Sequence, residues 1–255
     1  MEESKMKIES VGLQLFSIRD LLKTPADIAK TLPQVRAIGY TNVQVSGLGP
    51  IEPVELKKIL DDCGLKCCST HEPTQKILHE TESIIERVKI LGSPTTAIPF
   101  LPEEFRSEAG YKQVANLANE AGRKLKAEGI SLMYHNHAFE FQRYGEKTGL
   151  DILYGESDPD LLKAELDTYW VQYGGASPVA WCRRMANRMP LIHLKDMTMI
   201  NNTPAMVEIG YGNIDFHEVC TACEEGGVSW YMVEQDTSSH PPLESAKMSY
   251  EYIKE

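Results

Sequence analysis

The segment YHNHAFEF, residues 134–141, places two histidines, an asparagine and a glutamate at the end of a β-like run. Imidazole and carboxylate groups bind divalent cations, and imidazole also transfers protons near neutral pH. Three later runs, LLKAELD, LIHLKD and WYMVEQD, also carry acidic or histidine residues toward their ends. This recurrence indicates one site to which several strands contribute.

The elements that must position these residues alternate along the whole chain. The predicted strands span residues 10–16, 41–47, 65–71, 95–100, 130–137, 161–167, 190–196 and 229–235. Segments with apolar residues at helical spacing lie between them. This order and length predict an α/β fold, a closed (β/α)8 TIM barrel forming a single domain over residues 1–255. A doubly wound open sheet usually has a glycine-rich phosphate loop after its first strand, where this chain has QLFSIRD.

Alternation along the strands predicts which side chains point into the barrel. Asp167, His193 and Glu234 lie on the strand faces opposite the apolar residues of the same strands. A buried charge inside a barrel is costly unless it is paired or bound to metal. Any one of these residues alone could form a salt bridge or a hydrogen-bonded core group, but together they favour a divalent cation. Oxygen-rich ligation favours Mn²⁺ or Mg²⁺, with Co²⁺ or Zn²⁺ as alternatives.

Composition narrows the classes of partner. The formal net charge of −11 argues against a nucleic-acid binder, which needs a positive face. No apolar run approaches a membrane span, and MEESKMKIES lacks the apolar core of a signal peptide. We therefore expect a cytoplasmic protein with no membrane partner, unless a leader has been removed.

Cys220 and Cys223 lie within a predicted helix, which favours a buried helix face over a zinc or redox pair. A homo-oligomer is compatible with the barrel, but no pattern specifies one.

Six segments together resemble the xylose-isomerase-like TIM barrels, a sugar phosphate isomerase/epimerase group that also includes endonuclease IV and inosose dehydratases. The segments are GLQLFSIRD, YHNHAFEF, AELDTYWV, LIHLKDM, VEIGYGNIDF and YMVEQD, in order along nearly the whole chain. The resemblance implies a small carbohydrate substrate and a divalent metal. In the family a glutamate on strand five, an aspartate on strand six, a histidine on strand seven and a glutamate on strand eight hold that metal. Asp167, His193 and Glu234 match the last three positions.

The strand-five ligand is where this sequence departs from the family pattern. Alignment on the last glutamate of the segment leaves Tyr134 where the family has its metal glutamate, and gives Glu140 a substrate-side position. Alignment on the strand instead places His135 in the ligand position. Glu140 is named as the fourth ligand because it is the segment's only carboxylate, with His135 as the alternative and otherwise a substrate contact.

The chemistry that this site implies is proton abstraction next to a carbonyl. A divalent ion stabilises the enediolate that forms when the adjacent carbon loses its proton. Glu234 can act as both ligand and base, His137 as a second acid or base, and Lys195 as the group that stabilises the oxyanion. For each histidine, orienting a neighbour is an equal alternative. The other predicted substrate contacts lie near strand ends or in the EIGYGNID loop: Gln14, Arg19, His71 and Glu208.

The resemblance and the site residues leave four functions to compare, of which the first is preferred. The first is a metal-dependent isomerase or epimerase of a sugar or sugar phosphate. The alternative is a lyase, dehydratase or hydratase of a keto-sugar or keto-inositol, which the histidine-rich strand five favours. DNA cleavage is disfavoured by the acidic charge and the short histidine inventory. A non-catalytic sugar-binding barrel would bind its ligand without holding a metal.

Overall fold

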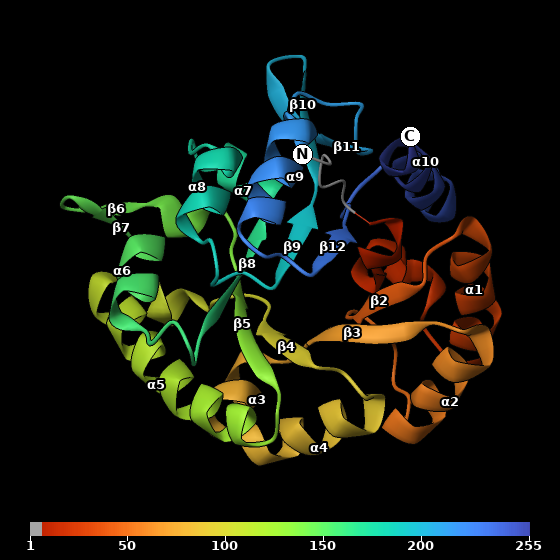
Figure 1. The fold of residues 1–255 in the computed structure, drawn as a ribbon, viewed down its shortest axis with the longest axis horizontal. Helices are drawn as coiled ribbons and strands as arrows, with labels where there is room; N and C mark the ends of the chain where they lie inside the picture. Colours follow the sequence, from red (N-terminus) through yellow and green to blue (C-terminus); the bar gives the residue numbers. More distant parts are fainter. Residues whose placement is uncertain (1–6) are drawn as a thin grey trace.

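The computed structural model describes residues 7–255, and its centre is a closed barrel of eight parallel strands. Their order around the barrel is β1-β12-β9-β8-β5-β4-β3-β2. Their bounds are β1 Val11–Gln14, β2 Asn42–Val45, β3 Lys66–His71, β4 Thr95–Ile98, β5 Ser131–His135, β8 Lys163–Asp167, β9 Leu191–Leu194 and β12 Trp230–Val233. The predicted TIM barrel is confirmed, with the helices outside the strands (Figure 1).

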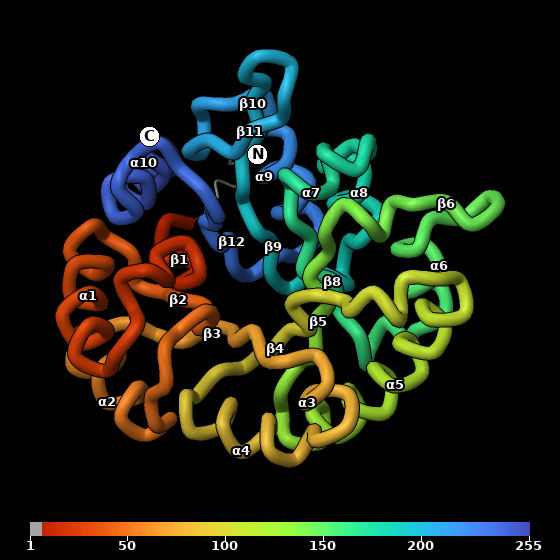
Figure 2. Tube along the Cα trace, turned by 180° about the vertical axis from the view of Figure 1, so that it is seen from behind, coloured from red at the N-terminus to blue at the C-terminus, as the bar shows by residue number. Residues whose placement is uncertain are grey.

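Helices surround the barrel on its outer side, as the view from behind also shows (Figure 2). They are α1 Pro25–Ile38, α2 Pro53–Cys63, α3 Thr74–His79, α4 Thr81–Leu91, α5 Glu108–Ala127, α6 Gly149–Glu156, α7 Thr168–Tyr173, α8 Pro178–Arg184, α9 Phe216–Glu225 and α10 Pro242–Lys254. Local signals set their ends. The Thr24 hydroxyl accepts the backbone N–H of Asp27 at the start of α1, with Pro25 at the first helical position. Gly64 ends α2 in the left-handed conformation, with φ 71°.

Two apolar layers hold the barrel together. Strand residues that face outward, such as Leu166, Ile192 and Val233, belong to the large core shared with the helices. Inside the barrel, a smaller buried cluster is formed by Cys68, Ala97, Met133, Leu191 and Met232. The alternation inferred for the three late strands is therefore observed, and the interior positions beyond this small cluster are free for polar residues.

Short elements lie between the barrel strands and the helices along the chain, or before the first strand. They are the 3-10 helices η1 Ile8–Ser10, η2 Leu15–Leu21, η3 Glu103–Phe105 and η4 Phe139–Phe141, and the strand pairs β6 Arg143–Tyr144 with β7 Lys147–Thr148, and β10 Asp196–Ile200 with β11 Thr203–Val207. The antiparallel hairpin β10–β11, which projects from the barrel in Figure 1, was not expected from the sequence. Asn201 and Asn202 form its turn with φ values of 49° and 60°, which suit asparagine better than most residues.

One buried carboxylate fixes the loop that follows this hairpin. The Asp196 side chain accepts backbone N–H bonds from Gly210, Gly212 and Ile214, at 3.0, 2.9 and 3.2 Å. The EIGYGNID segment is thus held against the end of β9. Within residues 7–255, no helix combines the length and apolar character needed to cross a bilayer.

Candidate metal centre and active site

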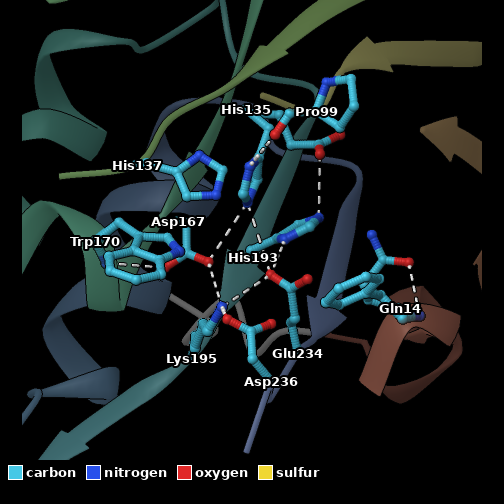
Figure 3. Close-up of polar contacts among 12 residues, drawn as sticks. Gln14, Pro99, His135, His137, Asp167, Trp170, His193, Lys195, Glu234 and Asp236 are labelled. Atoms are coloured by element: carbon cyan, nitrogen blue, oxygen red, sulfur yellow. Dashed lines mark hydrogen bonds and ion pairs between the residues drawn. The ribbon is translucent and has the colours of Figure 1, made fainter. Parts of the chain in front are cut away.

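Four buried side chains from four neighbouring strands meet at the C-terminal mouth of the barrel (Figure 3). His135 ends β5, Asp167 ends β8, His193 lies in β9, and Glu234 directly follows β12. Each offers one nitrogen or oxygen atom, and these four atoms all lie within 4.8 Å of one another. Residues far apart in the sequence therefore form one compact group, called the metal group below.

The spacing of these atoms suits a single divalent cation. His193 Nδ1 lies 2.8 Å from Glu234 Oε2, and His135 Nε2 lies 3.5 Å from Asp167 Oδ2 and 3.6 Å from Glu234 Oε2. Donor atoms that each sit about 2.1 Å from one ion are roughly 3 to 3.5 Å apart. The group therefore could hold a metal with little rearrangement.

Two atoms of the metal group have no hydrogen-bond partner within residues 7–255. His135 Nε2 and Asp167 Oδ2 are both buried and unpartnered, a costly condition for polar atoms in a protein interior. Their opposite ends are occupied: Asp167 Oδ1 accepts the Trp170 N–H at 3.0 Å as the N-cap of α7, and His135 Nδ1 lies 3.2 Å from the Pro99 carbonyl. Because a carbonyl can only accept, Nδ1 donates and the lone pair of a neutral ring is on Nε2. A bound cation would satisfy both unpartnered atoms.

The electrostatic environment attracts positive charge. Burial opposes the charged form of His193, but the carboxylates of Glu234 and Glu165 raise its pKa to about 9. Burial also opposes the charged form of His135, yet Asp167 and Glu234 raise its pKa well above the ordinary value. The pKa of Glu234 is held well below normal, against the effect of burial, by Lys195 and the two histidines. The environment of the metal group therefore favours positive charge, whether on protonated imidazoles or on a metal ion.

Lys195, which sequence alternation pointed inward, is fully buried beside the metal group. Its ammonium nitrogen lies 2.6 Å from Asp236 Oδ2, 3.4 Å from Glu234 Oε2 and 3.6 Å from Asp167 Oδ2. It also lies 5.2 Å from the centre of the Trp170 ring. A fixed cation thus lies next to the carboxylates, where it can stabilise negative charge that develops on a bound molecule.

His137 lies against a wall of aromatic rings at the same mouth. Its ring is stacked 5.5 Å from Phe139, lies edge-on to Phe100 at 5.2 Å, and is 5.2 Å from Trp170. Burial, together with the nearby positive groups, lowers the pKa of His137 to about 2, so the ring is neutral. His137 Nδ1 and Trp170 Nε1 are buried without hydrogen-bond partners, as are the two atoms of the metal group.

The structure does not bring Glu140 into the metal group. Its Oε1 accepts the Tyr134 hydroxyl at 2.7 Å, and its Oε2 accepts the His137 backbone N–H at 2.9 Å. Tyr134 belongs to the outer core between strands and helices, so this carboxylate lies behind β5. The physical reason is strand alternation: Tyr134 points outward and His135 inward. In this geometry His135, the alternative ligand, takes the place that the sequence interpretation gave to Glu140.

The remaining predicted contacts divide between two locations. Gln14 and His71 lie beside the metal group, where their side chains are 3.2 Å apart. Glu208 lies farther out and accepts the Ser238 hydroxyl at 2.7 Å, which braces the loop after β12. Arg19 donates to the backbone carbonyl of Asp236 at 3.1 Å.

Several residues of the site were not selected from the sequence. In LLKAELD, strand alternation puts Glu165 on the inward face with Asp167, and that alternation is sufficient to include it. The same rule applied to β2 would have found Gln44, whose amide contacts Glu165 at 2.9 Å. Strand alternation also places Asp236 on the same face as Glu234, although no role was assigned to it. Trp170 follows a strand end, where the side-chain direction is not fixed by periodicity.

Comparison with known proteins places this geometry in a family. The inosose dehydratase of Clostridium beijerinckii is 25% identical, over 100% of this chain and 97% of that protein. The crystal structure of a sugar phosphate isomerase/epimerase from Parabacteroides distasonis superposes with a TM-score of 0.81 and 27% identity, covering 99% of this chain and 96% of that one. A xylose isomerase-like TIM barrel protein from Mycobacterium smegmatis, in complex with magnesium, shares the fold with a TM-score of 0.76 and 14% identity, covering 96% and 95%. A family model described as xylose isomerase-like TIM barrel matches residues 32–255. The chain belongs to the xylose isomerase-like TIM barrel family.

Proposed function

We propose that this protein is a metal-dependent carbon–oxygen lyase that removes water from a cyclic polyhydroxy ketone. The proposal is supported by the metal group and by relatives named inosose dehydratase, one of which aligns over the whole chain. A cyclic keto-sugar or keto-inositol carries the required arrangement, a carbonyl with an acidic neighbouring C–H and a hydroxyl on the next carbon.

Four residues would hold the ion: His135, Asp167, His193 and Glu234. Their two imidazoles and two carboxylates suit Mn²⁺ or Mg²⁺, and Co²⁺ or Zn²⁺ as well. When bound, such an ion supplies a Lewis acid for the substrate carbonyl.

Glu234 would act as the base and Lys195 as the oxyanion partner. Glu234 takes the proton from the carbon beside the carbonyl, and its low pKa keeps it ionised for that role. The ammonium of Lys195, 3.4 Å from Glu234, donates a hydrogen bond to the oxygen on which charge develops. Glu234 then passes the proton to the departing hydroxyl, so that a C–H and a C–O bond break, a C=C bond forms and water leaves.

The observation that carries this proposal is the imidazole of His135 where the family pattern has a glutamate. Two-base epimerisation needs a second base on the opposite face of the reacting carbon, whereas elimination on one face needs only one. At the mouth, Asp236 is paired with Lys195 at 2.6 Å, and one oxygen of Asp167 is used as the N-cap of α7. Glu234 is assigned the proton transfer because it is the carboxylate at the strand-eight position, and its contact with Lys195, at 3.4 Å, is longer than that of Asp236.

The aromatic wall supports a closed-ring substrate. Phe100 is 46% exposed at this mouth, and Phe139 and Trp170 complete the wall around His137. The apolar C–H face of a sugar or cyclitol ring packs well on aromatic rings, while its hydroxyls require polar partners. His137 Nδ1 and Trp170 Nε1, which are unpartnered, are suited to bind those hydroxyls.

A metal-dependent sugar or sugar phosphate isomerase or epimerase is the second candidate. It begins with the same proton abstraction and ends with return of the proton to carbon. One observation favours it: the Parabacteroides distasonis protein with 27% identity is named sugar phosphate isomerase/epimerase. The ring of His137 is neutral and could take the position of the second base, but its low pKa makes it a weak one.

One experiment separates the two candidates. Protein loaded with Mn²⁺ is incubated in deuterated water with cyclic keto-polyols and with open-chain ketoses, and the products are analysed by NMR and mass spectrometry. Loss of one water from a cyclic ketone supports the lyase, whereas deuterium exchange with a new epimer supports the isomerase. Asp167→Asn should abolish either outcome. If loaded protein gives neither exchange nor loss of water with any of these compounds, both candidates are wrong.

A further inference from the structure

A second buried group lies next to the metal group and shares His193 with it. His71, Glu165 and His193 offer ligand-type atoms within 4.8 Å of one another. Glu165 Oε1 lies 2.5 Å from His71 Nε2 and 3.1 Å from His193 Nε2. Glu165 Oε2 accepts the Gln44 amide at 2.9 Å. Glu165 thus connects two histidines and a glutamine inside the barrel.

Hydrogen bonding distinguishes this group from the metal group. Gln14 donates to Gln44 Oε1 at 3.0 Å and lies 3.2 Å from His71 Nδ1. Gln44 Oε1 also lies 2.6 Å from His193 Nε2, and its amide nitrogen donates to Ser69 at 3.1 Å. None of these atoms is among the unpartnered buried atoms of the described residues, whereas the metal group contains two. The second group therefore already satisfies itself without an ion.

The bonds of this network have a fixed direction. An amide oxygen only accepts and an amide N–H₂ only donates. The oxygen Gln44 Oε1 lies 2.6 Å from His193 Nε2, and the amide nitrogen of Gln14 lies 3.2 Å from His71 Nδ1. His71 Nε2 and His193 Nε2 must therefore both donate toward Glu165. His71 Nδ1 is left as the acceptor for Gln14, and His193 Nδ1 faces Glu234 across 2.8 Å. The ring nitrogen that belongs to the metal group is thus the one opposite the Glu165 contact.

We propose that Glu165 is a positioning residue that orients His193 for metal binding. By accepting the Nε2–H, Glu165 fixes the ring orientation of His193 and keeps Nδ1 available as the ligand atom. Gln44, at 2.6 Å, is a second acceptor for the same N–H, and His71 braces Glu165 from the other side. Outer partners of this kind change metal affinity by about 10-fold to 100-fold. The proposal rests on the metal site of the proposed function, but it assigns a role that this function does not require.

The test is a titration of metal-free protein with Mn²⁺, in which electron paramagnetic resonance measures the Mn²⁺ that stays free. The unmodified protein should bind one Mn²⁺ per chain. Glu165→Gln should bind about 10-fold to 100-fold more weakly, because its amide can accept from one N–H but presents its own N–H₂ to the other donors. Pulsed measurement of nitrogen couplings should show two imidazoles on Mn²⁺ in the unmodified protein and an altered coupling for one of them in Glu165→Gln.

Glu140→Gln is the matched control, since Glu140 is also a fully buried glutamate that accepts hydrogen bonds but lies outside the metal group. It should bind Mn²⁺ as the unmodified protein does. Circular dichroism of the metal-free variants checks that they are folded. If Glu165→Gln does not fold, Gln44→Met replaces it as the test variant, and it should bind Mn²⁺ more weakly than the unmodified protein. Affinity of Glu165→Gln equal to that of the unmodified protein, or two Mn²⁺ per chain, would overturn the inference alone. No Mn²⁺ binding by the unmodified protein would instead overturn the proposed function.

Discussion

Glu140→Gln tests the identity of the strand-five ligand and has a measurable effect on stability. Glu140 is fully buried, and burial raises its pKa from 4.5 to about 7, although the Tyr134 hydroxyl and backbone N–H groups counteract part of this rise. Glutamine has nearly the same shape as the protonated acid and stays neutral at all pH values. The substitution therefore removes the titration while leaving one acceptor for Tyr134 or His137.

The magnitude follows from the two pKa values. A carboxyl group whose pKa is higher in the folded state binds its proton more tightly when folded. Its stabilising effect is complete below pH 4.5 and is lost as the pH rises to about 7. At about 1.4 kcal/mol for each pH unit in this window, deprotonation costs the folded state about 3 kcal/mol. The unmodified protein should lose that much stability relative to Glu140→Gln between these two pH values.

The assay is urea unfolding of both metal-free proteins at several pH values from 4 to 8. The unfolding free energy of Glu140→Gln minus that of the unmodified protein is plotted against pH. Other titrating groups cancel in this difference. Glu146→Gln, at an exposed glutamate in the same segment, controls for the substitution itself. A difference that stays constant across the window would refute the reasoning about burial. Loss of Mn²⁺ binding in Glu140→Gln would refute the assignment of His135 in its place.

Three further predictions concern other parts of the site and core. Lys195→Met should lower turnover by at least about 100-fold in steady-state kinetics, since a fixed cation beside developing charge is lost; it should also tighten Mn²⁺ binding in titration, and unchanged turnover would exclude the oxyanion role. Trp170→Phe keeps the aromatic face but removes one N–H donor, so KM should rise about 2-fold to 10-fold with kcat nearly constant; an unchanged KM would contradict the hydroxyl contact. Gly12→Ala should destabilise the barrel by roughly 1–3 kcal/mol in urea unfolding, because the added Cβ would overlap Met232; unchanged stability would show that Met232 can move aside.

The barrel and three members of the metal group could be predicted because both depend on periodicity. Strand alternation places Asp167, His193 and Glu234 inward, and parallel strands carry those ends to one mouth. The same rule placed Tyr134 outward and His135 inward. Naming Glu140 gave more weight to the chemical type of the residue than to strand geometry, and the structure follows the geometry.

Other features depend on information that periodicity does not contain. The hairpin β10–β11 could have been inferred from DMTMINNTPAMV, in which an Asn-Asn turn separates two short runs. The direction of Trp170 could not, because this residue follows a strand end where the chain changes course. The unpartnered atoms of His135 and Asp167 could not be inferred either, because they depend on the positions of side chains from several neighbouring strands.

The two oxygens of Asp167 connect the metal group to the aromatic wall. One oxygen holds the backbone N–H of Trp170 at the start of α7, while the other belongs to the metal group. An ion held by the metal group would therefore be coupled to the position of the indole through a single carboxylate. Thermodynamic reciprocity then requires that a ring bound against Trp170 tighten the equilibrium binding of the ion by the same factor by which the ion tightens that ring's binding. The enzyme should therefore retain its metal best while it is saturated with substrate, and lose it to chelators between turnovers.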